Sequence, residues 1–173
     1  TNNTAIGLCI GAYQVLVVDS NNCSDSAIVN IDEPTPLLSA ISDSTSPDCY
    51  GNCNGTATVS ANGGTLPYNY LWPNAGGQTS QLANGLCGDS LYMVIVSDSN
   101  SCLDTTLVTL SQPAIFEASI IDSSHISCYG LCDGYAIVQA TGGTSPYTYL
   151  WNDPGAQTND TATALCAGPY LAI

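Results

Sequence analysis

The sequence predicts an all-β fold made of tandem β-sandwich repeats with a 79-residue period and internal disulfides. Three observations predict it: a segment that returns at a fixed offset, short strand patterns between turn signals, and nine cysteines in 173 residues. The segment from Cys49 to Trp72 is identical to the segment from Cys128 to Trp151 at two thirds of its positions. A fixed period of this length indicates an array of similar small domains.

The fixed offset also sets the expected domain boundaries. We expect residues 34–112 to form one complete repeat. Residues 1–33 match the C-terminal part of a preceding repeat, and residues 113–173 match the N-terminal part of a following one. The connections at Glu33-Pro34 and Gln112-Pro113 contain no Gly/Ser linker, which predicts a semi-rigid rod. We therefore expect the natural polypeptide to be longer than this chain.

Identical and variable positions alternate when the two copies are compared, and this alternation predicts strands. From residue 53 to 63 the odd positions are identical to their counterparts one period later, whereas the even positions vary. This period of two indicates a strand with one buried face. Further strands are predicted at residues 37–43, 91–97 and 103–110, with counterparts at 115–122, 13–18 and 27–31. Short strands with turn signals roughly every 8–12 residues favour a β-sandwich.

Aromatic side chains alternate along the segment that follows the Gly63-Gly64 turn. We interpret them as a buried core stripe, and the alternative is an exposed platform that stacks on sugars. The residues are Tyr68, Tyr70 and Trp72, with Tyr147, Tyr149 and Trp151 as their counterparts. Between Cys87 and Tyr92 the middle copy carries one extra residue, which we expect in a turn or bulge.

The charge of the chain excludes several classes of partner. It has no lysine or arginine and 14 acidic residues, for a net charge of −14. Nucleic-acid binding and attachment to an anionic membrane both need cationic side chains, so we expect neither. No apolar run reaches the roughly 18 residues of a membrane span, so membrane insertion is not expected. The Asp19 and Asp98 turns are weak calcium candidates, although ordinary Asx turns are the preferred interpretation; no other cofactor is expected.

The cysteines predict disulfides and an oxidising, extracellular compartment. Zinc is disfavoured because Cys49 and Cys53 are not followed by a second close pair. Cys87 and Cys102 flank a strand of about 20 Å, which makes their direct pairing difficult. The only histidine, His125, has no catalytic partner in its Ser-rich surroundings, so we do not expect an enzyme.

A set of motifs resembles the SprB-type repeat of large cell-surface adhesins in gliding Bacteroidota. The motifs are Cys-Tyr-Gly-x-Cys-x-Gly, Gly-Gly-Thr-x-Pro-Tyr-x-Tyr-x-Trp, Gly-Leu-Cys, Tyr-x-Val-x-Val-x-Asp before Cys102, and a closing Gln-Pro. The second motif is also similar to PKD-type immunoglobulin-like domains. The resemblance implies immunoglobulin-like sandwiches, export by the type IX system, and a surface filament or stalk in adhesion or gliding, without catalysis. The absence of Lys and Arg departs from the family.

The resemblance also implies a disulfide pattern. It suggests the pairs Cys49–Cys102 and Cys53–Cys87, with Cys132–Cys166 equivalent to the second pair. The remaining cysteines would then lack partners inside this chain; they are Cys9, Cys23 and Cys128.

Asp-Ser and Asp-Thr pairs resemble the O-glycosylation motif of exported proteins in the same phylum. The candidate acceptors are Ser26, Ser44, Ser90, Thr105 and Thr161. Ser26 and Thr105 are separated by one period of the repeat, and the alternation of their strands predicts that both point outward. Lateral association of chains through Leu16 and Ile95 is the competing use of that surface.

Two functional hypotheses therefore stand beside each other. The first is a structural and adhesive stalk, whose partners are neighbouring repeats, lateral copies of the same protein, and surface glycans or a substratum. The second is an array of carbohydrate-binding modules with an exposed aromatic stripe. An enzyme whose catalytic domain lies outside this segment is a third alternative.

Overall fold

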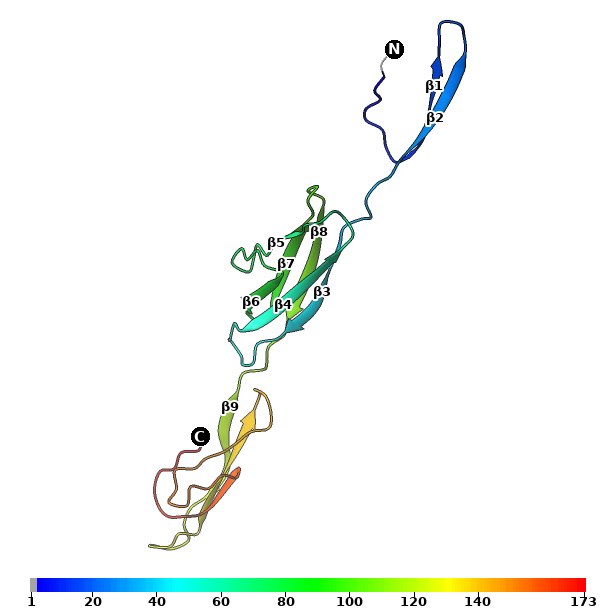
Figure 1. The fold of residues 1–173 in the computed structure, drawn as a ribbon. Coiled ribbons are helices and arrows are strands. Elements are labelled where there is room, and N and C mark those ends of the chain that lie inside the picture. The colour runs from blue at the N-terminus through cyan, green and yellow to red at the C-terminus, as the bar shows by residue number, and fades with distance from the viewer. Residues whose placement is uncertain (1–2) are drawn as a thin grey trace.

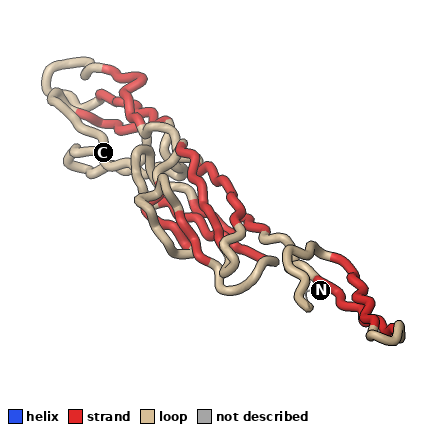
Figure 2. Tube along the Cα trace, turned by 90° about the horizontal axis from the view of Figure 1, so that it is seen from above, coloured by secondary structure: helices blue, strands red, loops and turns tan. Residues whose placement is uncertain are grey.

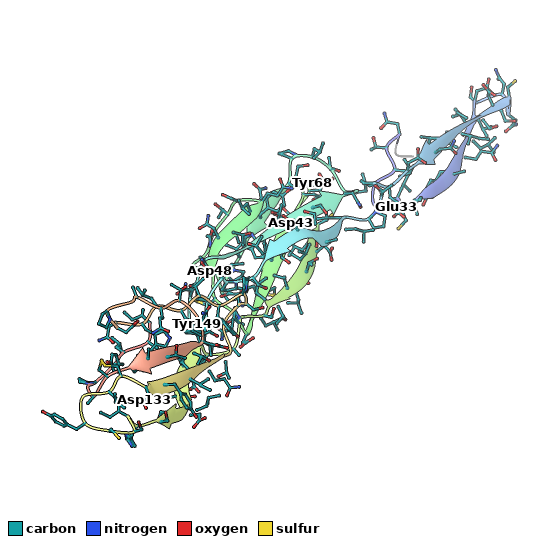
Figure 3. The ribbon with its side chains drawn as sticks, turned by 90° about the horizontal axis from the view of Figure 1, so that it is seen from below. Glu33, Asp43, Asp48, Tyr68, Asp133 and Tyr149 are labelled. Atoms are coloured by element: carbon teal, nitrogen blue, oxygen red, sulfur yellow. A yellow bond between two sulfur atoms is a disulfide. The ribbon has the colours of Figure 1, made fainter. Side chains whose placement is uncertain are left out.

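The computed structural model describes residues 3–173 as an elongated molecule in which the strands form three groups along its length (Figure 1, Figure 2). The corresponding stretches, residues 3–33, 34–112 and 113–173, are here named the first, middle and third segments. Glu33 lies on the connection between the first and middle segments, and Asp48 lies at the opposite end of the middle segment (Figure 3). The described residues are all strand, turn or loop. Consequently they contain no helix that could span a membrane.

The first segment is a single antiparallel hairpin. Its strands are β1 (Gly11–Val18) and β2 (Ser24–Ile31), paired in continuous register from Gly11 opposite Ile31 to Val18 opposite Ser24. The predicted turn at Asp19 joins them, because its Oδ1 accepts the N–H groups of Asn21 and Cys23, each at 2.8 Å. No second sheet covers this hairpin within residues 3–33, so its apolar side chains are almost all exposed.

The middle segment contains two three-stranded antiparallel sheets. Their strand orders are β3-β4-β6 and β5-β7-β8. The strands are β3 (Leu38–Thr45), β4 (Gly55–Asn62), β5 (Asn69–Leu71), β6 (Leu82–Leu86), β7 (Ser90–Ser97) and β8 (Leu103–Leu110). Side chains from both sheets share one core, in which the largest fully buried side chains are those of Trp72, Leu86 and Leu110.

The predicted alternation is confirmed in the strands that form this core. In β4, Gly55, Ala57 and Val59 are buried, whereas the residues between them are only half-buried. In β7, Tyr92 and Val94 alternate in the same way with more exposed neighbours. Because the spacing of two puts every second side chain on one face, each strand contributes one face to the core.

The third segment forms one sheet with the strand order β11-β10-β9. Its strands are β9 (Glu117–Ser124), β10 (Gly134–Thr141) and β11 (Thr161–Leu165), the counterparts of β3, β4 and β6. Opposite this sheet lies only a short pairing of Leu150 with Ile173 and of Trp151 with Ala172. The core is therefore small, and its buried members are Val138, Trp151, Ala162 and Leu165.

Candidate functional site

The contact between the middle and third segments is the candidate functional site, here named the junction. A cavity of about 510 Å³ lies there, lined by residues of both segments. The lining consists of Asp48, Cys49 and Tyr50 from the β3–β4 loop, Ala114, Ile115 and Phe116 from the connection, and Gly143 and Thr144 from the turn after β10.

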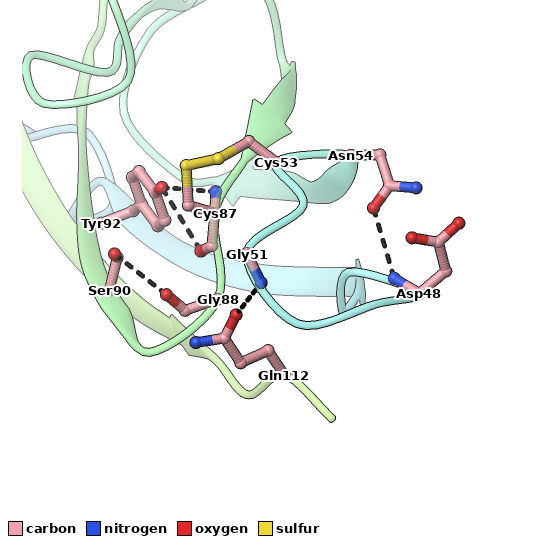
Figure 4. Close-up of a disulfide and its surroundings, with 9 residues drawn as sticks. All are labelled: Asp48, Gly51, Cys53, Asn54, Cys87, Gly88, Ser90, Tyr92 and Gln112. Atoms are coloured by element: carbon pink, nitrogen blue, oxygen red, sulfur yellow. Dashed lines mark hydrogen bonds between the residues drawn. A yellow bond between two sulfur atoms is a disulfide. The ribbon is translucent and has the colours of Figure 1, made fainter. Parts of the chain in front are cut away.

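Gln112 fixes the connection to the middle segment. Its side-chain Oε1 accepts the Gly51 N–H at 2.8 Å (Figure 4). Its Nε2 donates to Asp89 Oδ2 at 2.9 Å. The Asp89 N–H in turn donates to the Leu110 carbonyl at the end of β8, at 2.6 Å. The closing Gln-Pro of the repeat is therefore held by two separate loops of the segment that it leaves.

A pair of glycines fixes the connection to the third segment. The Gly143 N–H donates to the Ala114 carbonyl at 2.8 Å, and a Cβ on Gly142 would overlap the Ile115 carbonyl oxygen. Both glycines have positive φ, a region that other residues rarely occupy. The preceding boundary has the same arrangement, because the Gly64 N–H donates to the Thr35 carbonyl at 2.7 Å. The two boundaries thus share this Gly-Gly attachment.

The loop that lines the cavity is ordered by an acidic residue. The side-chain amide of Asn52 donates to Asp48 Oδ1 at 2.9 Å, and this hydrogen bond is the main reason why the pKa of Asp48 lies below its ordinary value. Asn54 accepts the Asp48 N–H at 3.3 Å (Figure 4). In the third segment Asp133 takes the place of Asn54 and accepts the N–H of Ser127, the counterpart of Asp48. The side chain and backbone of Ser127 lower the pKa of the Asp133 carboxyl.

Two disulfides lie close to the same ends of the sheets. Cys53 is bonded to Cys87, and Cys132 is bonded to Cys166, each across 34 residues. The Tyr92 hydroxyl accepts the Cys87 N–H at 2.7 Å, beside the disulfide (Figure 4). The pairs are the two inner pairs that the resemblance implied.

The tyrosine contact persists although the loops differ in length. Tyr13 donates its hydroxyl to the Cys9 carbonyl at 3.1 Å, and Tyr170 donates to the Cys166 carbonyl at 3.2 Å. In the middle segment, the longer loop between Cys87 and Tyr92 forms a turn, in which Asp89 has φ of 52°. The extra residue is thus accommodated before β7 begins.

The predicted pair Cys49–Cys102 is wrong for this chain, because both cysteines are free and exposed. Cys49 lies in the loop that Gln112 binds, just beyond the end of β8. Cys102 lies immediately before the start of β8, where its N–H donates to Asp98. The eight residues of β8 therefore separate the two cysteines by about 25 Å. Bridged Cα atoms lie within about 7 Å of each other.

The aromatic stripe faces the core in both copies. Trp72 is 0% exposed and Trp151 is 2% exposed, and each indole N–H donates to a backbone carbonyl. Tyr68 and Tyr70 are half-buried against the middle core, as Tyr149 is in the third segment. Tyr147 is half-buried and lies 5.7 Å from the ring of Phe116. These tryptophans leave no indole face free for a sugar.

The two calcium candidates act as turn residues. Asp98 is only 3% exposed; its Oδ1 accepts the N–H groups of Asn100 and Cys102, and its Oδ2 accepts that of Thr65. Burial by itself would raise the pKa of Asp98, but these backbone N–H donors outweigh it and lower the pKa. In the described residues no group of three or more His, Cys, Asp or Glu side chains could hold a metal ion.

The glycosylation candidates differ in accessibility. Ser26, Ser44 and Thr105 are exposed, whereas Ser90 and Thr161 are half-buried. The exposed Ser26 hydroxyl accepts a hydrogen bond from the Gln14 side chain of β1 at 2.9 Å. In β8 the face opposite Thr105 carries Asp104, Thr106 and Leu110 toward the core, so Thr105 points outward as expected.

His125 lines a second cavity, of about 360 Å³, on the uncovered side of the third segment. Cys166, already in a disulfide, and Tyr170 line the same cavity. Ser123 and Ser124 also line it, but in the described residues no hydrogen bond joins either hydroxyl to the imidazole of His125.

Comparison with protein families adds a separate line of evidence. The family model of the SprB repeat matches residues 41–77 and 121–156. The first range runs from within β3 to the loop after Trp72, and the second covers the equivalent part of the third segment. The sequence has no match among the curated proteins.

Proposed function

The chain carries two SprB repeats, and from this premise we propose that it is a structural and adhesive segment of a long bacterial cell-surface filament or stalk. SprB repeats indicate a surface-exposed repeat protein of the Bacteroidota type, and the family is a structural one and not an enzyme family. Within the proposal, immunoglobulin-like units recur with the period seen in the sequence, the type IX system exports the protein, and the filament serves adhesion or gliding.

The construction of the two boundaries supports this role best. At each boundary a Gly-Gly turn binds the connection, and Gln112 adds a second attachment between the middle and third segments. A connection held from both sides restricts bending more than a free linker of the same length would. A stalk needs this property, because it must keep a distant tip away from the cell surface.

Small-angle X-ray scattering on the intact chain tests the stiffness of the junction. The matched control is a variant with a short flexible Gly/Ser linker inserted after Gln112. We expect rod-like scattering from the native chain and a broader, more compact distribution from the control. Identical distributions would contradict the proposal. Labelling of intact cells with an antibody against residues 34–112 tests the surface location separately, and absence of label would contradict it.

The carbohydrate-binding alternative needs an accessible aromatic stripe. Because both tryptophans are buried, we expect blue-shifted fluorescence that does not change when oligosaccharides are added. A saturable change in the emission of either tryptophan would favour the carbohydrate-binding hypothesis.

We also propose glycosylation at Ser26 and Thr105 on the outer faces of β2 and β8. Their exposure and their equivalent positions in successive repeats support a sugar at the same place on each unit. The intact mass of native protein should exceed the sequence mass by hexose-sized increments. An unmodified mass together with concentration-dependent sedimentation would instead favour lateral association through Leu16 and Ile95.

A further inference from the structure

We propose that Cys49 forms a disulfide across the junction, with the Cys102 counterpart of the following repeat. By the same rule, Cys102 bonds to the Cys49 counterpart of the preceding repeat. The inference deepens the proposed function and rests on it, because it requires the tandem array to continue past residue 173. It assigns a role to two free cysteines that no bond within the middle segment can satisfy.

The register between β3 and β8 locates the missing partner. Asp104 Oδ2 accepts the Ser39 N–H at 2.6 Å, and the Ser46 and Ser111 hydroxyls lie 3.3 Å apart. Both pairs have the same sequence separation, so one constant register holds along these two strands. This register places Cys102 opposite Leu37, at the entrance of the middle segment.

The same position in the third segment lies at the junction cavity. The counterpart of Leu37 in the following repeat is Phe116, and Phe116 and Cys49 both line the cavity of about 510 Å³. A strand added to the third segment in the register of β8 would therefore place its leading cysteine beside Phe116. That cysteine would enter the cavity that Cys49 already lines.

The turn before β8 gives an independent placement. In the middle segment Thr65 binds this turn through three of its atoms: its N–H donates to Asp98, its carbonyl accepts the Ser99 N–H, and its hydroxyl accepts from Asn100. The counterpart of Thr65 is Thr144, which also lines the junction cavity. The turn and the strand register thus lead to the same cavity.

The chemistry of the bond is ordinary thiol oxidation. The thiols of Cys49 and of the following repeat lose two protons and two electrons as their S–S bond forms. A disulfide oxidant accepts them and is reduced to two thiols. The exposure of Cys49 and Cys102 leaves both sulfurs accessible to such an oxidant.

An extended chain tests the proposal directly. Tyr170–Ile173 correspond to Tyr92–Ile95, because Leu150 pairs with Ile173 as Leu71 pairs with Ile95. Residues 96–112 of the same sequence, appended after Ile173, would therefore complete the third segment. The four competing thiols are replaced by Cys9→Ser, Cys23→Ser, Cys102→Ser and Cys128→Ser, so that only Cys49 and the appended cysteine remain free.

After oxidation with glutathione disulfide, we expect both remaining thiols to be lost. Non-reducing chymotryptic mapping should then join the peptide that ends at Tyr50 to the appended peptide. The matched control is the same extension with serine at its cysteine, in which Cys49 should stay reactive. Recovery of Cys49 as a free thiol from the folded extended chain would overturn the proposal, as would its linkage to any other cysteine.

A second variant keeps the test decisive if the extension does not fold. In the unextended chain with the same four serine substitutions, Phe116→Cys places a thiol at the position beside which the missing cysteine is expected. It should bond to Cys49 on oxidation, and failure to do so would overturn the proposal. Scattering from the extended chain with Cys49→Ser separates the two ideas, since a rod-like profile would leave the stalk proposal standing even if no cross-link forms.

Discussion

The middle and third segments share most of their buried residues but differ in the sheet that covers them. Val59 and Trp72 correspond to Val138 and Trp151, and all four are buried. At the edge of the core the difference is large, because Leu37 is 8% exposed whereas its counterpart Phe116 is 58% exposed. In the middle segment β7 and β8 supply the second half of the core, and residues 113–173 include no equivalent of β8.

The comparison teaches which parts of the repeat organise themselves locally. The disulfide, the tryptophan and the three strands around them form in the third segment as they do in the middle one. Because these parts close within the earlier part of the repeat, they do not need the later strands. The remaining strands add the apolar area that most of the stability depends on.

The largest difference is expected for the tryptophans. Trp72→Ala should lower the free energy of unfolding of the middle segment by about 3–5 kcal/mol, because it leaves a cavity in a core closed on both sides. Trp151→Ala should cost clearly less, since water reaches the uncovered side of that core. Native-state amide exchange, read segment by segment, measures both losses, because it does not depend on the tryptophan that each variant removes. Equal losses in the two segments would contradict the comparison.

Removal of the disulfides should act equally on the two segments. Each bond closes a loop of the same length, 34 residues, so each should contribute about 2–4 kcal/mol by restricting the unfolded chain. Double replacement by serine, at Cys53 and Cys87 or at Cys132 and Cys166, tests this in thermal unfolding. When Cys132 and Cys166 are replaced, the third segment should unfold at a lower temperature than the middle segment, because its core is smaller. If only the middle segment responds, the bonds do not have equivalent roles.

Substitution of the glycines at the boundaries should have a smaller effect. Gly142→Ala and Gly63→Ala should each cost about 1–3 kcal/mol, because the new Cβ would overlap a carbonyl of the connection and φ is positive. Gly76→Ala is the matched control, since its φ is 73° but nothing lies within 4 Å of its Cβ. We expect roughly 1 kcal/mol for the control. If Gly76→Ala lowers the free energy of unfolding as much as the other two substitutions do, overlap with the connection does not explain their effect.

The smallest effect concerns acid stability. The hydrogen bonds from the Ser39 side chain and backbone hold the pKa of Asp104 below its ordinary value. The contact therefore stabilises the fold above the unfolded pKa of about 3.9, and this stability is lost as the pH falls through the lower folded pKa. Asp104→Asn should reduce the acid-dependent loss by under about 1 kcal/mol, because the carboxylate is partly exposed to solvent.

The third segment provides the comparison for this measurement. Ala118 replaces Ser39 there, so this particular contribution to acid sensitivity is absent from residues 113–173. Urea midpoints at pH 5 and pH 3, read from Trp72 in a Trp151→Phe background, measure the effect. An unchanged difference between the two midpoints in Asp104→Asn would contradict it.

Much of the strand structure could be predicted, because comparison of two copies separates constrained from free positions. The alternation at Ala57 and Val59 correctly predicts the buried face of β4. The sequence pattern does not predict β6 and β11, since each has only five residues and their alternation is interrupted. In β6 the interruption is Gly85, whose φ is 66°. Local backbone irregularity of this kind leaves no periodic signal.

The cysteine pattern shows a different limit. The family resemblance suggested that Cys49 and Cys102 pair within one unit, and position along the chain contains no information on which end of a sheet each occupies. Only the direction of β8 reveals that they lie at opposite ends. The sequence also could not predict the junction cavity, because the cavity depends on how the middle and third segments contact each other.

The side-by-side arrangement of β3 and β8 has a mechanical consequence. In the proposed filament, tension enters the middle segment at β3 and leaves it at β8. The contacts of Ser39 with Asp104 and of Ser46 with Ser111 show that the two strands run in the same direction. Pulling at these ends must shear the contacts together and cannot open them one by one. If they yield, the Cys53–Cys87 bond still withholds a 34-residue loop, roughly 115 Å of contour, from extension. Each unit would then lengthen by a limited step under load and keep a folded remnant from which to recover.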